Sequence, residues 1–196
     1  MEFIPNLQRA RLFVYAENIQ LFDYSIYKQA LSLFNRAKDL FPDDIKVSSG
    51  FGNYYLKIGE VEKAKDDFQH IISVNPNSIE GYIGMGDCYQ SQEDVSNAEE
   101  YYQTAIIKAS GWSEGYRRLF TLYGRPESFN THEEEILSLS ERAVSVDPQN
   151  EYDIYLDLGS VYQQNRHYVE AHKLFQKAID LDNTRVGDMV PTVIAI

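Results

Sequence analysis

Apolar residues recur at steps of three and four along most of this chain, which is the spacing that places them on one face of an α-helix. In residues 45–78 this spacing runs from Val47 to Tyr55, is interrupted at Gly59, and resumes until Pro76. Because glycine favours turns and proline ends helices, the segment predicts one helix, a tight turn and a second helix. The sequence therefore predicts helical hairpins, and a hairpin cannot bury its apolar face alone.

The hairpin pattern returns at a fixed interval of 34 residues. The positions that recur at this interval are Ala30, Ala64 and Ala98, then Phe34, Phe68 and Tyr102, then Tyr55, Tyr89 and Tyr123. A period of this size is typical of a stacked array of helix pairs rather than of one globular core. Gly52 and Ala64 have little or no side chain, so we expect the two helices of a pair to approach closely there, beside Phe68.

The residues in phase also match a known motif, which runs aromatic, two residues, Leu-Gly, two residues, Tyr, then Ala, three residues, Phe. Two segments carry it as Tyr82, Met85-Gly86, Tyr89, Ala98 and Tyr102, and as Tyr155, Leu158-Gly159, Tyr162, Ala171 and Phe175. The chain thus resembles the tetratricopeptide repeat family. The resemblance implies an all-α, right-handed superhelical solenoid of about five helix-turn-helix repeats.

The resemblance covers nearly the whole chain as a single repeat domain over residues 1–185. The five expected repeats span residues 11–44, 45–78, 79–112, 113–150 and 152–185. In the first repeat, Glu17 and Asn18 stand where Leu-Gly is usual, as suits a terminal repeat whose outer side meets water. Residues 186–196 form a tail, which is either flexible or the start of a following domain.

The fourth repeat is longer than the others, because four additional residues separate Tyr123 from Ala143. We expect these residues to form a longer turn at 124–128. Thr131 and Glu134 then have the spacing of a capping box that restarts the helix.

The composition limits the classes of partner and the cellular compartment that we expect. The 196 residues include 18 basic and 30 acidic side chains, a net charge of −12, which argues against nucleic acid or an anionic membrane as the main partner. The only cysteine, Cys88, has no partner for an internal disulfide, and we expect it to be a small buried residue rather than a reactive thiol. No secretory signal is recognisable, so the sequence predicts a reducing, cytoplasmic setting.

No motif for catalysis or for a cofactor emerges. The segment 50–55 begins like a dinucleotide loop but lacks the third glycine and a preceding strand. The four histidines show no pair at the spacing of metal ligands, and we expect them at the surface. The sequence therefore predicts a protein without enzyme activity, metal or cofactor.

The family resemblance implies that the first helices of successive repeats line a concave groove. The residues on that face are Tyr15, Ile19, Phe22, Asn53, Lys57, Ile83, Asp87, Arg117 and Thr121. This implies a non-catalytic scaffold or adaptor that binds a peptide or helix of a partner protein. Alternatives stay open: the three apolar residues could pack beneath residues 1–10, and the polar ones could be ordinary solvated side chains.

The carboxyl end suggests a second function and a further partner. Residues 192–196 form an apolar, β-branched run after Pro191, which is typical of a buried strand. The alternative function is therefore the amino-terminal targeting or regulatory region of a larger multidomain enzyme. The fifth repeat also lacks a polar capping helix, which predicts self-association through that end, near Ala171, Phe175 and Ala178.

Overall fold

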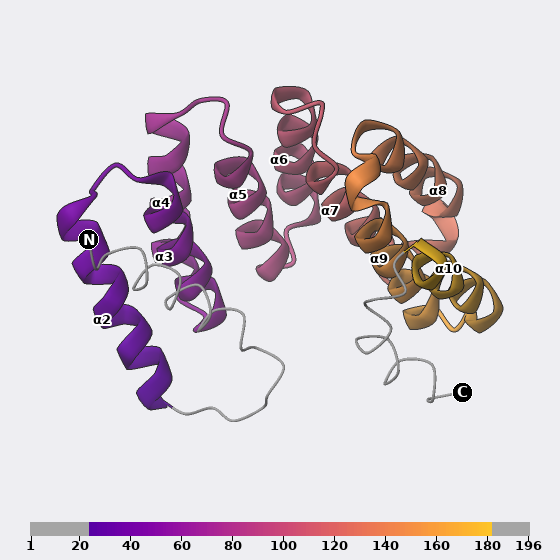
Figure 1. Ribbon diagram of the computed structural model, residues 1–196, viewed down its shortest axis with the longest axis horizontal. Helices are drawn as coiled ribbons and strands as arrows, with labels where there is room; N and C mark the ends of the chain where they lie inside the picture. Colours follow the sequence, from indigo (N-terminus) through magenta and orange to yellow (C-terminus); the bar gives the residue numbers. More distant parts are fainter. Residues whose placement is uncertain (1–23, 182–196) are drawn as a thin grey trace. The chain divides into compact units, whose positions relative to one another are not determined.

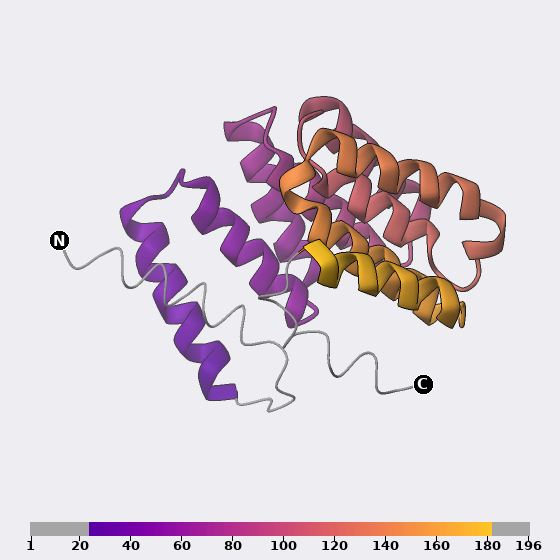
Figure 2. The same cartoon turned by 45° about the vertical axis from the view of Figure 1, so that its right-hand side comes forward.

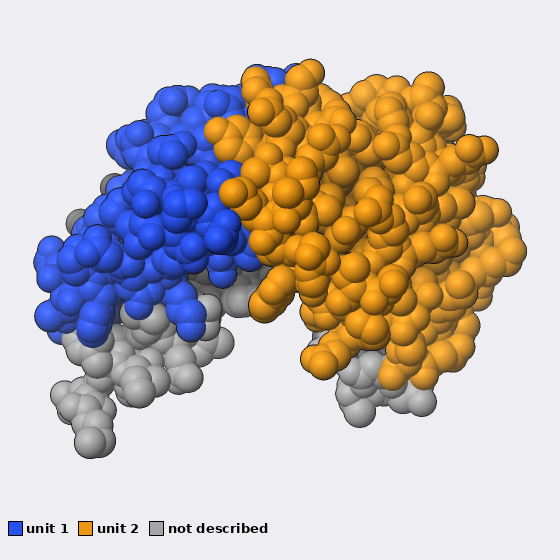
Figure 3. Space-filling model, turned by 90° about the horizontal axis from the view of Figure 1, so that it is seen from above, with its two compact units in different colours: residues 1–94 blue, residues 95–196 orange. Residues whose placement is uncertain are grey.

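The computed structural model describes residues 24–181, with side chains from residue 31 onward. In this range the chain forms nine α-helices and one short 3-10 helix, and it has no β-strand. The all-α fold expected from the repeat pattern is confirmed. The chain divides into two compact units, residues 1–94 and 95–196, which Figure 3 shows in different colours. We describe each unit by itself.

The amino-terminal unit contains four described helices (Figure 1). They are α2 (Tyr24–Leu40), α3 (Ile45–Lys57), α4 (Val61–Val74) and α5 (Ile79–Ser91). Each packs against the next along the chain, and α3 also contacts α5. The start of α3 is fixed by Asp44, whose side chain accepts a hydrogen bond of 2.7 Å from the backbone N–H of Lys46. Such a cap satisfies one of the amide donors that a helix leaves unpaired at its first turn.

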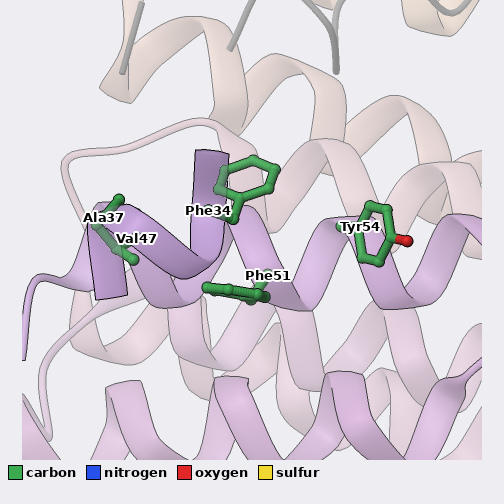
Figure 4. Packing of buried hydrophobic residues seen from close by; sticks show 5 residues of the cluster. All are labelled: Phe34, Ala37, Val47, Phe51 and Tyr54. Atoms are coloured by element: carbon green, nitrogen blue, oxygen red, sulfur yellow. The ribbon is translucent and has the colours of Figure 1, made fainter. Parts of the chain in front are cut away.

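Figure 4 shows the apolar cluster where α2 meets α3. Its members are Phe34, Ala37, Val47, Phe51 and Tyr54, and all of them are buried. The rings of Phe34 and Phe51 lie 5.4 Å apart between centroids, at an angle of 45°. The apolar residues that recur at helical spacing in the sequence therefore form the core of this pair of helices.

Phe68 on α4 is held between two glycines of neighbouring helices. A Cβ added to Gly52 on α3 would stand 2.6 Å from the nearest atom of the Phe68 ring, and one added to Gly84 on α5 would come closer still. Ala64, one turn before Phe68, is fully buried. The expected role of small residues at the close approach is confirmed, and it extends to the next repeat.

The turns inside the helix pairs share one backbone feature. Gly59 has a φ of 80°, and Glu93, one repeat later, has a φ of 61°. Arg166 in the last described turn has a φ of 65°. Each repeat of this kind therefore turns through one left-handed residue, a conformation that costs energy for any residue with a side chain.

The carboxy-terminal unit contains the remaining helices (Figure 2). They are α6 (Val95–Lys108), α7 (Glu114–Tyr123), α8 (Phe129–Val146), the 3-10 helix η1 (Pro148–Asn150), α9 (Glu151–Gln164) and α10 (Tyr168–Leu181). Within this unit, helices adjacent in the sequence pack together, and α7 also contacts α9. The side chain of Ser113 donates to Asp147 at 2.9 Å, which ties the α6–α7 turn to the turn before α9.

The fourth repeat has the predicted longer turn at residues 124–128, because α7 ends at Tyr123 and α8 begins at Phe129. The second helix of this repeat is longer as well. α8 has 18 residues, whereas α4, α6 and α10 have 14 each. A gain of four residues is about one helical turn. The predicted capping box at Thr131 and Glu134 is wrong, because α8 already begins at Phe129, and the Thr131 hydroxyl donates to the carbonyl of Ser128 instead.

The predictions about the ends of the chain concern the first helix, the tail and self-association. The first helix of the first repeat and the tail at 186–196 lie outside the described residues. In α10, Ala171, Phe175 and Ala178 are buried, and Phe175 packs where a Cβ on Gly159 of α9 would stand. These three residues are part of the core of the last helix pair, and self-association through this end of the fifth repeat stays a prediction. The exposed apolar side chains of α10 are Tyr168, Val169 and Leu181.

Candidate functional site

The predicted groove residues fall into three groups. Tyr15, Ile19 and Phe22 lie outside the described residues. Asn53, Lys57, Ile83 and Asp87 lie on α3 and α5 of the amino-terminal unit, and Arg117 and Thr121 lie on α7 of the carboxy-terminal unit.

In the amino-terminal unit, Asn53 and Lys57 are exposed on α3, and Asp87 on α5 is half-buried. We refer to these three residues as the α3–α5 face. Ile83 differs from the prediction, because only 7% of it is exposed and it belongs to the buried core. It lies directly before Gly84, at which α5 meets the ring of Phe68. The apolar contact expected from Ile83 in the groove is therefore replaced by packing inside the unit.

In the carboxy-terminal unit, Thr121 is exposed, whereas Arg117 is held by two carboxylates. Its Nε donates to Oδ2 of Asp157 on α9 at 2.7 Å, and its Nη2 lies 2.6 Å from the same oxygen. Its Nη1 donates to Oε2 of Glu114, one turn earlier on α7, at 3.1 Å. The other oxygen of Glu114 accepts from Arg118 at 3.0 Å. We refer to Glu114, Arg117, Thr121 and Asp157 as the α7–α9 face.

Asp157 was not among the residues predicted from the sequence. Burial raises the pKa of its carboxyl, and the neighbouring Arg117 lowers that pKa in part. The burial is partial, because the side chain of Asp157 is 38% exposed, and the positive charge of Arg117 favours the ionised form of the carboxyl. The repeat offered one signal for this residue: Asp157 stands where the second and third repeats have Gly50 and Gly84, and a charged residue at a position of close approach is unusual.

Sequence reasoning also missed an aromatic cluster where the α7–α8 turn meets the α9–α10 turn. His132 stacks on Tyr123 with centroids 4.7 Å apart, and His167 lies 5.0 Å from Phe129 and 6.0 Å from Tyr162. The two histidines were expected at the surface, but both are half-buried against these rings. Through this cluster, the additional turn of α8 packs against the last helix pair.

Hydrogen bonds complete this cluster. The Tyr162 hydroxyl donates to Glu133 at 3.3 Å, and burial, together with that carboxylate, raises its pKa to about 12. The Tyr123 hydroxyl donates to Glu99 at 2.9 Å, and burial raises its pKa as well. Both phenols are therefore neutral donors at physiological pH, which suits structural rather than acid–base roles.

Cys88 is confirmed as a buried side chain, with no exposed surface. Burial raises the pKa of its thiol to about 12, so the reactive thiolate form is suppressed at neutral pH. Within residues 24–181, no group of three histidine, cysteine or acidic side chains is placed to hold a metal ion. No helix in the same range has the length and apolar character needed to cross a bilayer.

Comparisons with known families agree with the helix pairs. Models of the tetratricopeptide repeat match residues 50–78, 79–106 and 152–185. The last of these ranges coincides with the fifth predicted repeat. No curated protein matches the sequence.

Several solved structures resemble the chain. The protein TTC0263, a thermophilic tetratricopeptide repeat protein in Thermus thermophilus, is 18% identical with a TM-score of 0.72, over 97% of this chain and 100% of that one. MamA is 20% identical with a TM-score of 0.55, over 84% of this chain and 93% of that one. YrrB, described as a tetratricopeptide repeat protein with an unusual peptide-binding site, is 19% identical with a TM-score of 0.50, over 94% and 89% of the two chains. At these identities the likeness shows the fold.

The paired helices, the glycines at their close approaches and the repeated turns define a helical repeat protein of the solenoid class. The chain belongs to the tetratricopeptide repeat family. A fold of this kind is typically a non-catalytic scaffold, and it makes the chain a protein-interaction module.

Proposed function

We propose that the chain binds an extended peptide or a single helix of a partner protein against the first helices of its repeats. One observation carries this proposal: Asn53, Asp87 and Thr121 occupy the same position in three successive repeats and lie on α3, α5 and α7. Asn53 and Thr121 are exposed and Asp87 is half-buried, whereas the residues just before them, Gly52, Gly86 and Phe120, are buried. The first helices thus separate a packing face from a polar one.

Polar side chains at a regular interval suit the recognition of a peptide. An amide, a carboxylate and a hydroxyl can pair with the N–H and C=O groups of a bound segment, whichever side chains it carries. The apolar anchors that would add affinity are Tyr15, Ile19 and Phe22, which lie outside the described residues. The similarity to YrrB, whose description includes a peptide-binding site, supports the same kind of ligand.

The charge of the chain supports a protein as partner. With 30 acidic and 18 basic residues, the surface repels the phosphates of nucleic acids and of anionic membranes. We place this activity in the cytoplasm. The alternative role, as the amino-terminal region of a larger enzyme, depends on residues 186–196, which lie outside the described residues.

A binding assay with matched variants tests the proposal. The chain is immobilised and exposed to native extract beside two double variants, Asn53→Ala with Thr121→Ala, and Gln69→Ala with Ser138→Ala. The control pair also removes one exposed polar side chain from each compact unit, but on the second helices α4 and α8. We expect a partner to be retained by the native chain and the control and lost by the first variant, at equal helicity. Equal retention by all three would refute the proposed site.

A further inference from the structure

Arg117 is the cation at the centre of the α7–α9 face, and no nitrogen of its guanidinium group lacks a carboxylate neighbour. Nε and Nη2 both reach Oδ2 of Asp157, and Nη1 reaches Glu114. The Nε and Nη2 edge of a guanidinium group is one of those that bind a carboxylate through two parallel hydrogen bonds. Here that edge is already occupied by Asp157, from the neighbouring first helix.

The position of this pair makes it relevant to binding. Glu114, Arg117 and Thr121 follow one another at steps of three and four along α7, so they share one side of the helix, and Thr121 is exposed. The side chains of Arg117 and Asp157 are 22% and 38% exposed. A segment lying across α7 and α9 on this side would therefore meet the ion pair directly.

The charges around the pair favour cations. Arg117 and Arg118 stand beside the carboxylates of Glu114 and Asp157, so the arginines of this face are already paired with acidic side chains. The described part of this unit, residues 95–181, contains 14 acidic and eight basic side chains. A lysine or arginine of a partner would complement this face, whereas a carboxylate would have to displace Asp157 from Arg117 first.

We propose that Asp157 is a specificity-determining residue, which occupies Arg117 so that the α7–α9 face excludes acidic segments and accepts a segment carrying lysine or arginine. This inference rests on the proposed function, because it concerns the same first helices. It adds the class of ligand and the residue that selects it. Asp157 competes with an acidic ligand for Arg117. Its carboxylate already makes the contacts with the guanidinium group that a carboxylate of the ligand would make.

The test measures the binding of two probes, an end-capped tetraglutamate peptide and an end-capped tetralysine peptide, to the whole chain at low salt and at about 0.15 M salt. The main variant is Asp157→Ala, which uncovers the Nε and Nη2 edge of Arg117. The control is Asp153→Ala, which removes the same charge from α9 one turn earlier. A second variant, Asp157→Asn, keeps the shape of the side chain in case the alanine variant does not fold.

We expect the native chain to bind tetralysine more tightly than tetraglutamate. Asp157→Ala should bind tetraglutamate at least about tenfold more tightly than the native chain and the control do, which corresponds to about 1.4 kcal/mol. Asp157→Asn should show a smaller gain, because its amide oxygen still accepts from Arg117. Adding Arg117→Gln to Asp157→Ala should abolish the gain.

Two results would overturn the inference. One is an equal gain in Asp157→Ala and Asp153→Ala, which would show an effect of net charge alone. The other is tight binding of tetraglutamate by the native chain that is lost in Arg117→Gln, which would show that Arg117 is already available. Neither result depends on a natural partner, so the inference can fail while the proposed function stands, and the reverse also holds.

Discussion

The ring of Phe129 stands almost perpendicular to that of Tyr162, with the centroids 5.3 Å apart and an angle of 87° between the planes. This is the edge-to-face arrangement that aromatic rings prefer. Phe129 is the first residue of α8 and Tyr162 lies on α9, so the contact joins the additional turn of the fourth repeat to the fifth. The longer α8 therefore contributes a core residue.

The burial of Phe129 leads to a first prediction. Phe129→Ala should lower the free energy of unfolding by about 3–5 kcal/mol, because it removes a ring that is only 1% exposed and leaves a cavity. Urea unfolding followed by circular dichroism measures the change. The matched control is Trp112→Ala, which removes a 62% exposed aromatic ring from the same unit and should change stability by less than about 0.5 kcal/mol. Similar losses in both variants would contradict this account.

The sequence predicted the helix pairs well, because the spacing of the apolar residues and the position of the glycines are local signals. Gly52 and Phe68 are in close contact where the pattern placed them, and Ala64 is buried. The longer turn at 124–128 was predicted, but the additional helical turn of α8 was not, since a count of residues does not say whether they extend a turn or a helix. Phe129 lies in that additional helical turn and packs against Tyr162, which is 33 positions away in the sequence.

The candidate site was less predictable from the sequence. The first helices and the polar position shared by Asn53, Asp87 and Thr121 follow from the repeat alone. The partner of Arg117 does not, because Asp157 lies 40 residues away and reaches it only through the packing of α7 against α9. Contacts between repeats depend on side-chain rotamers and on the angle between helices, and a periodic sequence pattern predicts neither of them.

The glycine beside Phe68 leads to a second prediction. Gly84→Ala should destabilise the amino-terminal unit by about 1–3 kcal/mol, because the new Cβ would overlap the ring of Phe68. The control is Gly111→Ala, since a Cβ there has open space around it. Thermal or urea unfolding of both variants decides the question. In a Phe68→Leu background the cost of Gly84→Ala should shrink, and an unchanged cost would show that another contact is responsible.

The left-handed turn residues lead to a third prediction. Glu93→Gly and Arg166→Gly should each raise the free energy of unfolding by up to about 1 kcal/mol, because glycine adopts a positive φ without a steric penalty. The reverse change, Gly59→Ala, should lower it by about 1 kcal/mol, although a Cβ at Gly59 would touch no other atom. The three variants are compared by urea unfolding. A loss of stability in both glycine variants would show that contacts of the original side chains outweigh the backbone effect.

Asp67 on α4 leads to a prediction about pH. Its side chain is 10% exposed and lies 3.3 Å from Lys38, and burial raises the pKa of its carboxyl even though Lys38 lowers it in part. The folded protein therefore binds this proton more tightly than the unfolded chain does. Acidification from neutral pH toward the ordinary aspartate pKa of about 3.9 should stabilise the native chain relative to Asp67→Asn, and below that value the gain should stop, because both states are protonated. Urea unfolding of the two proteins between pH 7 and about pH 4 measures the difference. A relative stability of the native chain that decreases as the pH is lowered would mean that the ion pair with Lys38 outweighs the cost of burial.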